Sequence, residues 1–265
     1  MKIKELAAEK PAPELAEKFK IGMAGYTFAA IDREKSLDVA LDVMQKMDVH
    51  YLCIKDFHLP LNSTPEQIAA FHAKLAAKGV VGYGVGPIYM NTEAEVDNAF
   101  EYAKRVGVRL IVGVPLQNLL PYVDKKVKQY DMNFAIHLHG PDMPYKYPDA
   151  EDVWNHVKDL DPRIGMCLDI GHDTRNGKDP VADLKRYKSR VFDIHIKDVT
   201  GTTKAGYSVE IGRGVIDFPA FVNALRETGY DGVCGLEHEK NMRDPYTGIG
   251  ESIGYLRAVI AEKQR

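Results

Sequence analysis

The chain has 265 residues, of which 45% are hydrophobic and 28% are charged. This composition is ordinary for a globular protein with a sizeable core, and the length fits one large α/β barrel or two small domains. The formal net charge of −3 argues against nonspecific nucleic-acid binding, because such binding needs a surplus of lysine and arginine.

The two ends of the chain differ in character. Residues 1–19 predict a polar lead-in, and residues 20–265 predict a single domain without an internal linker. No apolar run approaches the roughly 20 residues that a membrane span requires, so we expect no membrane contact. The N-terminus lacks an apolar signal region, which leaves the compartment open between the cytoplasm and, if a signal segment has been removed, the periplasm.

Short apolar runs alternate with helix-sized segments along the chain. The first helix follows Asp32, a residue suited to capping, and the second begins at Thr64-Pro65 and stops at Gly79. The predicted strands are residues 20–29, 51–55, 80–85, 109–114, 133–138, 164–170, 191–196 and 233–236. The predicted helices are residues 33–47, 64–79, 92–106, 119–130, 150–160, one segment between 170 and 191, 219–228 and 249–263.

Eight strands in strict alternation with eight helices predict a closed parallel (β/α)8 TIM barrel. The alternative is an open doubly wound sheet, but the count is eight and no strand leads through GxGxxG into a helix. The glycine-rich run at residues 82–86 is followed by Pro87, so we interpret it as a tight strand end. Cys53, Cys167 and Cys234 fall inside separate predicted strands, which predicts buried core thiols.

Ionisable residues gather where the last four predicted strands end. Because residues two apart in a strand point the same way, each pair faces one rim of the barrel. The residues are His137 and His139, then Asp169, then His195 and Lys197, then Glu237 and Glu239. We expect His137, Asp169, His195 and Glu237 to bind a divalent cation, with Mn²⁺, Mg²⁺, Co²⁺, Ni²⁺ and Zn²⁺ all open.

Such an ion suits chemistry beside a carbonyl group. A metal that holds a sugar hydroxyl and carbonyl makes the neighbouring C–H more acidic by stabilising the enediolate charge. A positioned base must still remove the proton. We therefore expect a small-molecule sugar or keto-sugar substrate, and a homo-oligomer remains open.

The motifs Asp169-Ile-Gly-His172, His195-Ile-Lys-Asp198 and Leu236-Glu237, with His137-Leu-His139-Gly140 upstream, resemble those of a known superfamily. They are similar to the sugar phosphate isomerase/epimerase superfamily, the xylose isomerase-like barrels (AP endonuclease family 2), from about Ile21 to the C-terminus. The resemblance implies that Asp169, His195 and Glu237 are metal ligands and that His172 contacts substrate hydroxyls. It also makes Glu237 a candidate acid/base.

One position departs from the superfamily pattern. Many of its epimerases carry a metal-bound glutamate at the fifth strand end, paired with the eighth-strand glutamate across the substrate carbon. Here His137 takes that position, and a metal-bound neutral imidazole is a poor second proton acceptor. The substitution weakens the case for a symmetric epimerisation with two carboxylates.

Because His137 replaces the second glutamate, other polar residues near the rim become candidates for proton transfer. His172, Lys55 and Lys197 are further candidates for catalysis. A lysine near a cation can have a lowered pKa or, when charged, stabilise an enolate. The cluster at residues 55–58 also resembles that of barrels that act on 3-keto-glycosides, where β-elimination needs one base. We expect substrate contacts from the following residues: His58, His139, His172, Arg213 and Glu239.

The function we expect first is a metal-dependent sugar isomerase or epimerase. The alternative, of nearly equal weight, is a metal-dependent lyase that eliminates the glycosidic group of 3-keto-glycosides. A nuclease of the AP endonuclease type is disfavoured because the chain lacks extra ligands and a basic groove. A non-catalytic sugar-binding barrel would retain ligand binding after metal removal.

Overall fold

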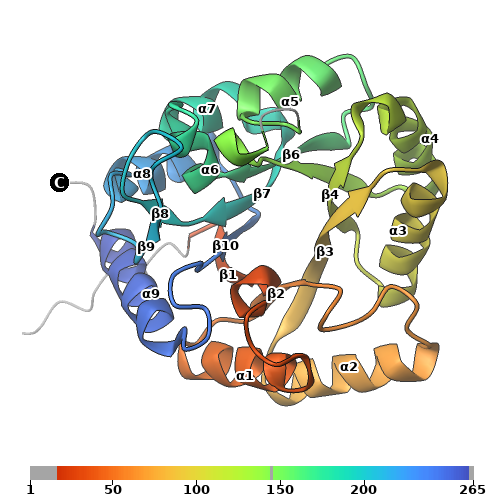
Figure 1. Cartoon of the computed structure of the whole chain (residues 1–265), viewed down its shortest axis with the longest axis horizontal. Coiled ribbons are helices and arrows are strands. Elements are labelled where there is room, and N and C mark those ends of the chain that lie inside the picture. Colours follow the sequence, from red (N-terminus) through yellow and green to blue (C-terminus); the bar gives the residue numbers. More distant parts are fainter. Residues whose placement is uncertain (1–16, 144–145, 263–265) are drawn as a thin grey trace, which may run out of the picture.

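Eight parallel strands close into a barrel in the computed structural model, which describes residues 17–143 and 146–262 (Figure 1). The strands are β1 Lys20–Ala24, β2 Tyr51–Ile54, β3 Val81–Met90, β4 Leu110–Pro115, β5 Asn133–His137, β6 Ile164–Asp169, β7 Val191–Ile196 and β10 Val233–Leu236. Their order around the barrel is β1-β10-β7-β6-β5-β4-β3-β2, and β1 pairs with both β10 and β2. The predicted (β/α)8 barrel is confirmed.

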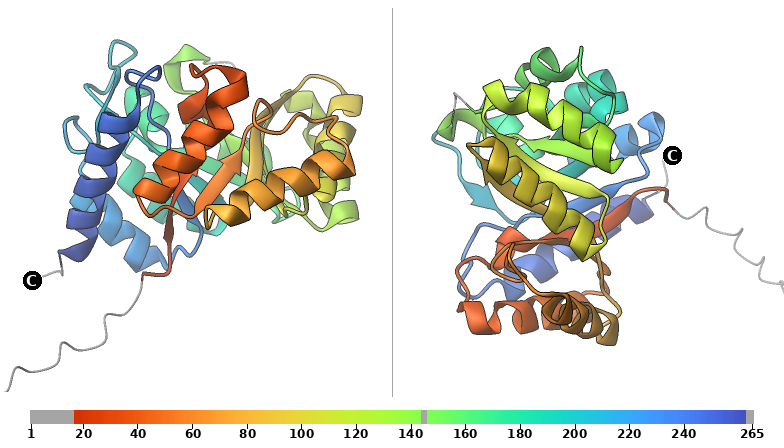
Figure 2. Two further views of the ribbon diagram at one scale, coloured as in Figure 1. Left: turned by 90° about the horizontal axis from the view of Figure 1, so that it is seen from below. Right: turned by 90° about the vertical axis from the view of Figure 1, so that its right-hand side faces the viewer.

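Helices surround the strands (Figure 1). They are α1 Arg33–Lys46, α2 Pro65–Ala77, α3 Glu93–Val106, α4 Leu120–Tyr130, α5 Ala150–Val157, α6 Ile170–Arg175, α7 Pro180–Tyr187, α8 Phe218–Thr228 and α9 Tyr246–Ala261. The last helix returns beside the first, as Figure 2 shows, and the Tyr246 hydroxyl donates to Asp42 Oδ2 at 3.3 Å. The ring of helices is therefore closed like the sheet inside it.

Helix boundaries follow the local sequence. Asp32 accepts a hydrogen bond from the backbone N–H of Glu34 and caps α1, as predicted. Thr64 and Gln67 form a reciprocal capping box ahead of α2, whose first residue is Pro65. Gly107 ends α3 with a φ of 83°, a left-handed conformation that glycine adopts without a Cβ clash.

Two strand ends differ clearly from the prediction. The first strand ends at Ala24, and a 3₁₀ turn, Gly25–Phe28, follows it. The predicted strand end before Pro87 is wrong, because β3 runs on to Met90 and pairs with β4 through residues 88–90. The register shifts between Val85 and Ile88, so Pro87 lies in an irregular stretch where its missing N–H disturbs no regular ladder.

The connection from β6 to β7 holds two helices where the sequence predicted one. Asp169 ends β6 and caps α6 at once, because its Oδ1 accepts from the backbone N–H of His172 at 2.8 Å. The second helix, α7, begins at Pro180. One carboxylate thus fixes the strand end, the helix start and the position of His172.

A two-stranded hairpin follows β7 over the barrel rim. It pairs β8, Asp198–Val199, with β9, Ser208–Val209. The Asp198 carboxylate accepts hydrogen bonds from four backbone N–H groups, those of Val199, Gly212, Gly214 and Ile216. Asp198 therefore organises the loop after β7 rather than the space above the barrel.

The three cysteines lie in the core of the protein. Cys53, Cys167 and Cys234 are all buried and unpaired with one another, which confirms the predicted core thiols. Cys53 and Cys167 pack together with the side chains of Val112 and Ala135 inside the barrel.

Apart from residues 17–19, the predicted lead-in lies outside the described residues. Within residues 17–143 and 146–262, every helix is too short or too polar to cross a lipid bilayer.

A buried carboxyl pair joins α6 to α7 and predicts a pH effect on stability. Burial and the neighbouring Asp183 raise the pKa of Asp173 well above its usual value. In the folded state Asp173 therefore keeps a proton that it loses above about pH 4 in the unfolded chain. The free energy of unfolding consequently falls as pH rises from about 4 towards the raised pKa.

We expect Asp173→Asn to remove this fall in stability with pH, because an amide can donate a hydrogen bond but has no proton that titrates in this range. Relative to wild type, the free energy of unfolding of the variant should rise by up to about 1.4 kcal/mol per pH unit between about pH 4 and the raised pKa of Asp173. Urea titrations at pH 5, 6.5 and 8 would measure it. A difference between the two proteins that stays constant with pH would show that Asp173 is ionised in the fold.

Candidate metal centre

The four predicted metal ligands lie at or next to the carboxyl ends of neighbouring strands. His137 is the last residue of β5, Asp169 the last of β6, and Glu237 directly follows β10. His195 lies one residue before the end of β7, and the strand register places it beside Asp169. All four side chains are buried, with His195 and Asp169 fully so.

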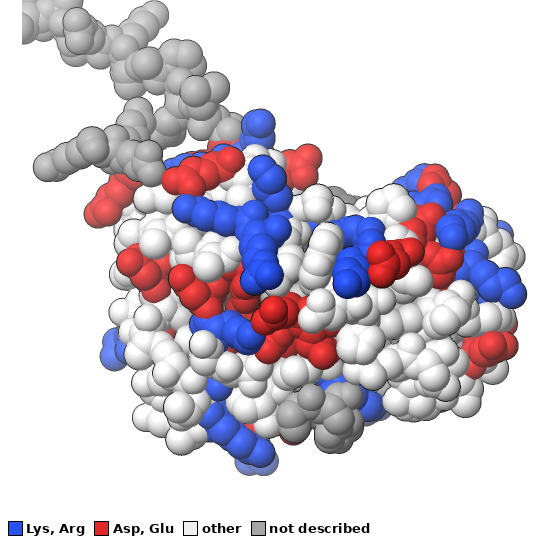
Figure 3. Space-filling view, turned by 90° about the horizontal axis from the view of Figure 1, so that it is seen from above, with Lys and Arg blue, Asp and Glu red and all other residues white. Residues whose placement is uncertain are grey.

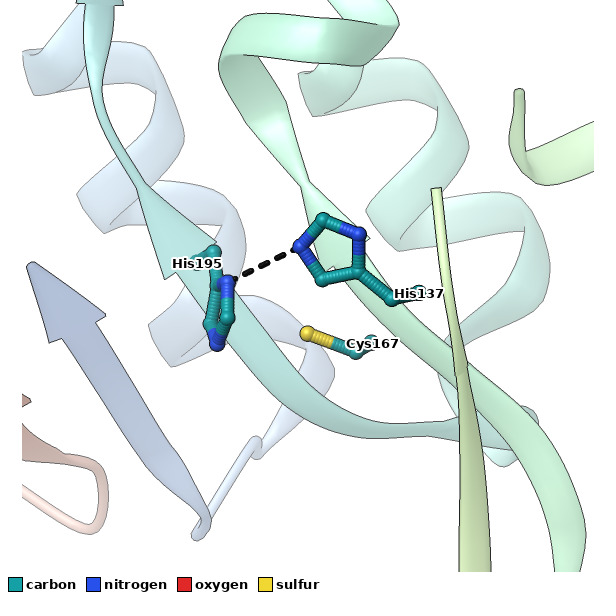
Figure 4. Close-up of side chains that lie close together, drawn as sticks. All are labelled: His137, Cys167 and His195. Atoms are coloured by element: carbon teal, nitrogen blue, oxygen red, sulfur yellow. Dashed lines mark hydrogen bonds between the residues drawn. The ribbon is translucent and has the colours of Figure 1, made fainter. Parts of the chain in front are cut away.

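The structure brings the four side chains together. His137 Nε2 lies 3.0 Å from His195 Nδ1 and 3.6 Å from Asp169 Oδ2 (Figure 4 shows the two imidazoles). Glu237 Oε1 lies 3.5 Å from His195 Nδ1. One ligand atom from each residue falls within 4.8 Å of the other three, so the atoms surround a common point. Two imidazole nitrogens and two carboxylate oxygens are a donor set that suits Mn²⁺, Co²⁺, Ni²⁺ or Zn²⁺.

Lys197 sits beside this cluster amid three carboxylates. Its Nζ lies 3.1 Å from Asp169 Oδ2, 2.6 Å from Glu237 Oε2 and 2.9 Å from Glu239 Oε2. Burial alone would lower the pKa of Lys197, but these carboxylates outweigh it and raise the pKa well above its usual value. Of the two roles expected for Lys197, this environment favours that of a charged ammonium group.

Glu237 is the carboxylate that keeps its charge. Burial alone would raise the pKa of Glu237, but Lys197 and His195 hold it well below its usual value. Its Oε1 faces the imidazoles, whereas its Oε2 pairs with the lysine. The two oxygens of one side chain thus face two different partners.

Neutral imidazoles line the cavity where β5 and β6 end. Burial lowers the pKa of His139 to about 4 and that of His172 well below its usual value. His139 Nδ1 lies 3.1 Å from the carbonyl oxygen of His137, which can only accept, so Nδ1 carries the proton. His139 Nε2 is then an acceptor, and the Tyr89 hydroxyl donates to it at 2.8 Å.

These groups line a cavity of about 220 Å³ at the carboxyl-terminal mouth of the barrel. The lining residues are Tyr26, Lys55, Pro87, Tyr89, His137, His139, His172, Glu237 and Glu239. Lys55 reaches the cavity from the end of β2, where its Nζ donates to the carbonyl oxygen of Pro87 at 2.5 Å. The predicted residues Lys55, His139, His172 and Glu239 therefore share one cavity with two of the predicted ligands, His137 and Glu237.

Two cavity residues were missed by the sequence analysis. Tyr26 lies in the 3₁₀ turn after β1, and Tyr89 lies in the part of β3 beyond Pro87. The sequence analysis placed Tyr26 inside the first strand and Tyr89 in no element. Their position at the rim of the barrel was therefore not predicted. The available signal was an aromatic residue just after each of two apolar runs, at the rim where barrels place binding residues.

Two predicted substrate-binding residues lie elsewhere. His58 Nε2 pairs with Ser36 Oγ at 3.0 Å, and its side chain lines a separate groove with Leu37 and Phe71. Arg213 pairs with Glu251 of α9, and 61% of its side chain is exposed. Neither side chain lines the cavity described above.

We expect Arg213→Ala to leave kcat/KM within about threefold of wild type, since exposed ion pairs contribute at most about 1 kcal/mol. Steady-state kinetics on the substrate identified by the experiments below would measure it. A tenfold or larger rise in KM would instead place Arg213 in contact with substrate.

The comparisons with known proteins identify the family of this chain. The sequence model of the xylose isomerase-like TIM barrel family matches residues 49–259. The chain belongs to that family. The resemblance seen in the sequence motifs is thereby confirmed.

Two relatives of this chain are an inosose dehydratase and a rhizopine catabolism protein. An inosose dehydratase of Lacticaseibacillus casei is 32% identical over 234 residues, which cover 71% of this chain and 78% of that protein. The rhizopine catabolism protein MocC of Rhizobium meliloti is 28% identical over 140 residues, 46% of this chain and 42% of MocC.

Solved structures share the fold. D-psicose 3-epimerase of Clostridium cellulolyticum H10, solved with D-tagatose, has a TM-score of 0.73 at 16% identity and covers 91% of this chain and 99% of its own. The IOLI protein, solved with a zinc atom, has a TM-score of 0.65 at 18% identity over 91% of this chain and 96% of its own.

Proposed function

We propose that this chain is a divalent-metal-dependent lyase that removes a proton beside the ketone of a cyclic keto-sugar or keto-cyclitol and eliminates the β-substituent. His137, Asp169, His195 and Glu237 would hold the ion. When bound, the ion would polarise the substrate carbonyl and so stabilise the enolate charge. The fit is supported by the buried donor atoms that surround one point.

The observation that carries the proposal is the uneven distribution of bases around the cavity. Apart from Asp169 at the end of β6, the carboxylates of the site are Glu237 and Glu239, which both follow β10. The β5 side instead presents His137 and His139, whose pKa values are lowered by burial and which are neutral. Epimerisation needs a proton acceptor on each face of the carbon, whereas elimination needs one base and a donor for the leaving group.

Four residues in or beside the cavity would then have chemical roles. Glu237, with its lowered pKa, is ionised and can take the proton beside the ketone. The Lys197 ammonium, 2.6 Å from it, balances the charge of the carboxylate and of the developing enolate. The Tyr89 hydroxyl and His172, which line the cavity, would contact the substrate hydroxyls and the leaving oxygen.

The names of relatives support elimination. The Lacticaseibacillus casei protein is called a dehydratase of inosose, a cyclic ketone, and it covers 71% of this chain. Loss of water and loss of an alcohol from the carbon next but one to a ketone are the same elimination with different leaving groups. We therefore include both keto-cyclitols and 3-keto-glycosides in the proposed substrate class.

A sugar isomerase or epimerase is the second candidate. The same ion and the same Glu237 would form an enediolate. The Lys197 ammonium, in contact with Glu237 and Glu239, offers a proton that an isomerase could return to the neighbouring carbon. The observation that favours this candidate is therefore the buried ammonium itself.

One experiment separates the two candidates. The protein, supplied with Mn²⁺ or Zn²⁺, is incubated in D₂O with inosose, with a methyl 3-keto-glucoside and with ketohexoses, and the products are followed by NMR and mass spectrometry. Released water or methanol with an unsaturated ketone supports elimination. Deuterium beside the carbonyl without loss of a group supports isomerisation, and unchanged substrates under all conditions would contradict both.

A further inference from the structure

His195 has two ring nitrogens, and they face opposite sides. Its Nδ1 points into the cluster, 3.0 Å from His137 Nε2 and 3.5 Å from Glu237 Oε1. Its Nε2 is buried and has no hydrogen-bond partner among the described residues. A buried ring nitrogen without a partner is uncommon and asks for a reason.

The nearest carboxylate to this nitrogen lies deeper in the barrel. Asp193 precedes His195 by two residues on β7, so both side chains point into the interior. Asp193 Oδ2 lies 3.6 Å from His195 Nε2, a few tenths of an ångström beyond a hydrogen bond. Neither the predicted site nor the proposed reaction uses this side chain.

Asp193 is held in place by other interior groups. The Tyr83 hydroxyl donates to its Oδ1 at 3.1 Å, and the Cys167 thiol donates to its Oδ2 at 3.6 Å. Figure 4 shows Cys167 pointing toward the two imidazoles from below. The Asp193 side chain is fully buried, and a fully buried carboxylate is costly unless a donor group needs it.

We propose that Asp193 is a positioning residue for the metal centre: its carboxylate keeps the proton of His195 on Nε2, which leaves the Nδ1 lone pair free for the ion. The inference rests on the proposed metal centre. A metal-bound histidine commonly donates its other N–H to a carboxylate, which fixes the tautomer and strengthens the ligand.

The tautomer matters because only one form can bind. If the proton moved to Nδ1, the lone pair would point at Asp193 and the N–H would point at the ion. An asparagine at position 193 favours this wrong form. Its carbonyl oxygen would keep the Tyr83 hydrogen bond, and its NH₂ group would then face His195 Nε2, which must become the acceptor.

The test compares Asp193→Asn and Asp193→Ser with a control, Tyr83→Phe, which removes a partner of Asp193 but leaves the carboxylate. Affinity for Zn²⁺ and Mn²⁺ is measured by calorimetry on the stripped protein, and thermal melts check folding. The His195 Nε2–H resonance is followed by ¹H–¹⁵N NMR with and without metal, assigned through a His195→Asn variant.

We expect Asp193→Asn to weaken metal binding by about 10- to 100-fold. We expect its Nε2–H resonance to disappear, and Tyr83→Phe to change affinity by less than about threefold. Unchanged affinity in both Asp193 variants, or a persistent Nε2–H resonance in Asp193→Asn, would overturn the inference. If wild type binds no divalent ion, the metal centre itself fails, and the resonance in the metal-free proteins still decides whether Asp193 orients His195.

Discussion

Glu237→Gln is expected to lower kcat by about 10²- to 10⁴-fold, the range typical for loss of a positioned general base. The amide is close in shape but cannot accept the substrate proton. It would also lose the ion pair in which Glu237 Oε2 and Lys197 Nζ lie 2.6 Å apart. Steady-state and single-turnover kinetics with saturating metal, on protein whose metal content has been measured, would report the loss.

Glu239→Gln is the matched control, since it makes the same chemical change two residues away. Glu239 also contacts Lys197, and its carboxylate accepts from Ser208 Oγ at 3.2 Å, but it does not belong to the four-residue cluster. We expect it to raise KM more than it lowers kcat. Equal kcat losses in the two variants, or a near-normal kcat in Glu237→Gln with metal bound, would remove Glu237 from the role of base.

Metal removal is expected to abolish turnover and to lower thermal stability together. An ion that binds only the folded state stabilises it by about 2.7 kcal/mol when its free concentration is 100 times Kd. For a chain of this size that corresponds to a rise of roughly 5–10 °C in Tm. Dialysis against a chelator, followed by titration of Mn²⁺, Co²⁺ and Zn²⁺, would measure both effects.

His195→Ala provides the control for this titration, because it removes a ligand nitrogen from the centre of the cluster. Its Tm should respond little to added metal. Full activity after chelation would contradict the proposal, as would an equal metal-induced rise in Tm in wild type and His195→Ala.

The fold was predictable because its signals are local. Eight apolar runs with capped helices between them suffice for a parallel barrel, and the caps at Asp32 and Thr64 lie where the sequence placed them. Boundaries that depend on tertiary pairing were not predictable. Residues 88–90 became part of β3 only because β4 lies beside them, and no local signal shows that.

The metal cluster was predictable because strand geometry is regular. His137, Asp169, His195 and Glu237 each lie at or next to the end of a parallel strand, and parallel strands bring their carboxyl ends to one rim. The surface of Figure 3 is also consistent with the charge argument, since acidic and basic side chains are interspersed on the face it shows. Among the described residues on that face, lysine and arginine side chains form no continuous basic groove.

Residues on loops were less predictable. Arg213 follows β7 as expected, but Glu251 of α9 draws its guanidinium away from the cavity. His58 follows β2, yet Ser36 of α1 turns it into a separate groove. Conversely, Asp193 is hidden in the interior of a strand, where a carboxylate gave no signal until its distance to His195 was known.

Anomalous scattering from crystals grown with Mn²⁺ or Zn²⁺ tests the central proposal most directly. We predict one anomalous peak per chain at the barrel mouth, with ligand atoms from His137, Asp169, His195 and Glu237 within about 2.0–2.3 Å of it. A peak coordinated by other side chains, or no peak at saturating metal, would contradict the proposed centre and the chemistry derived from it.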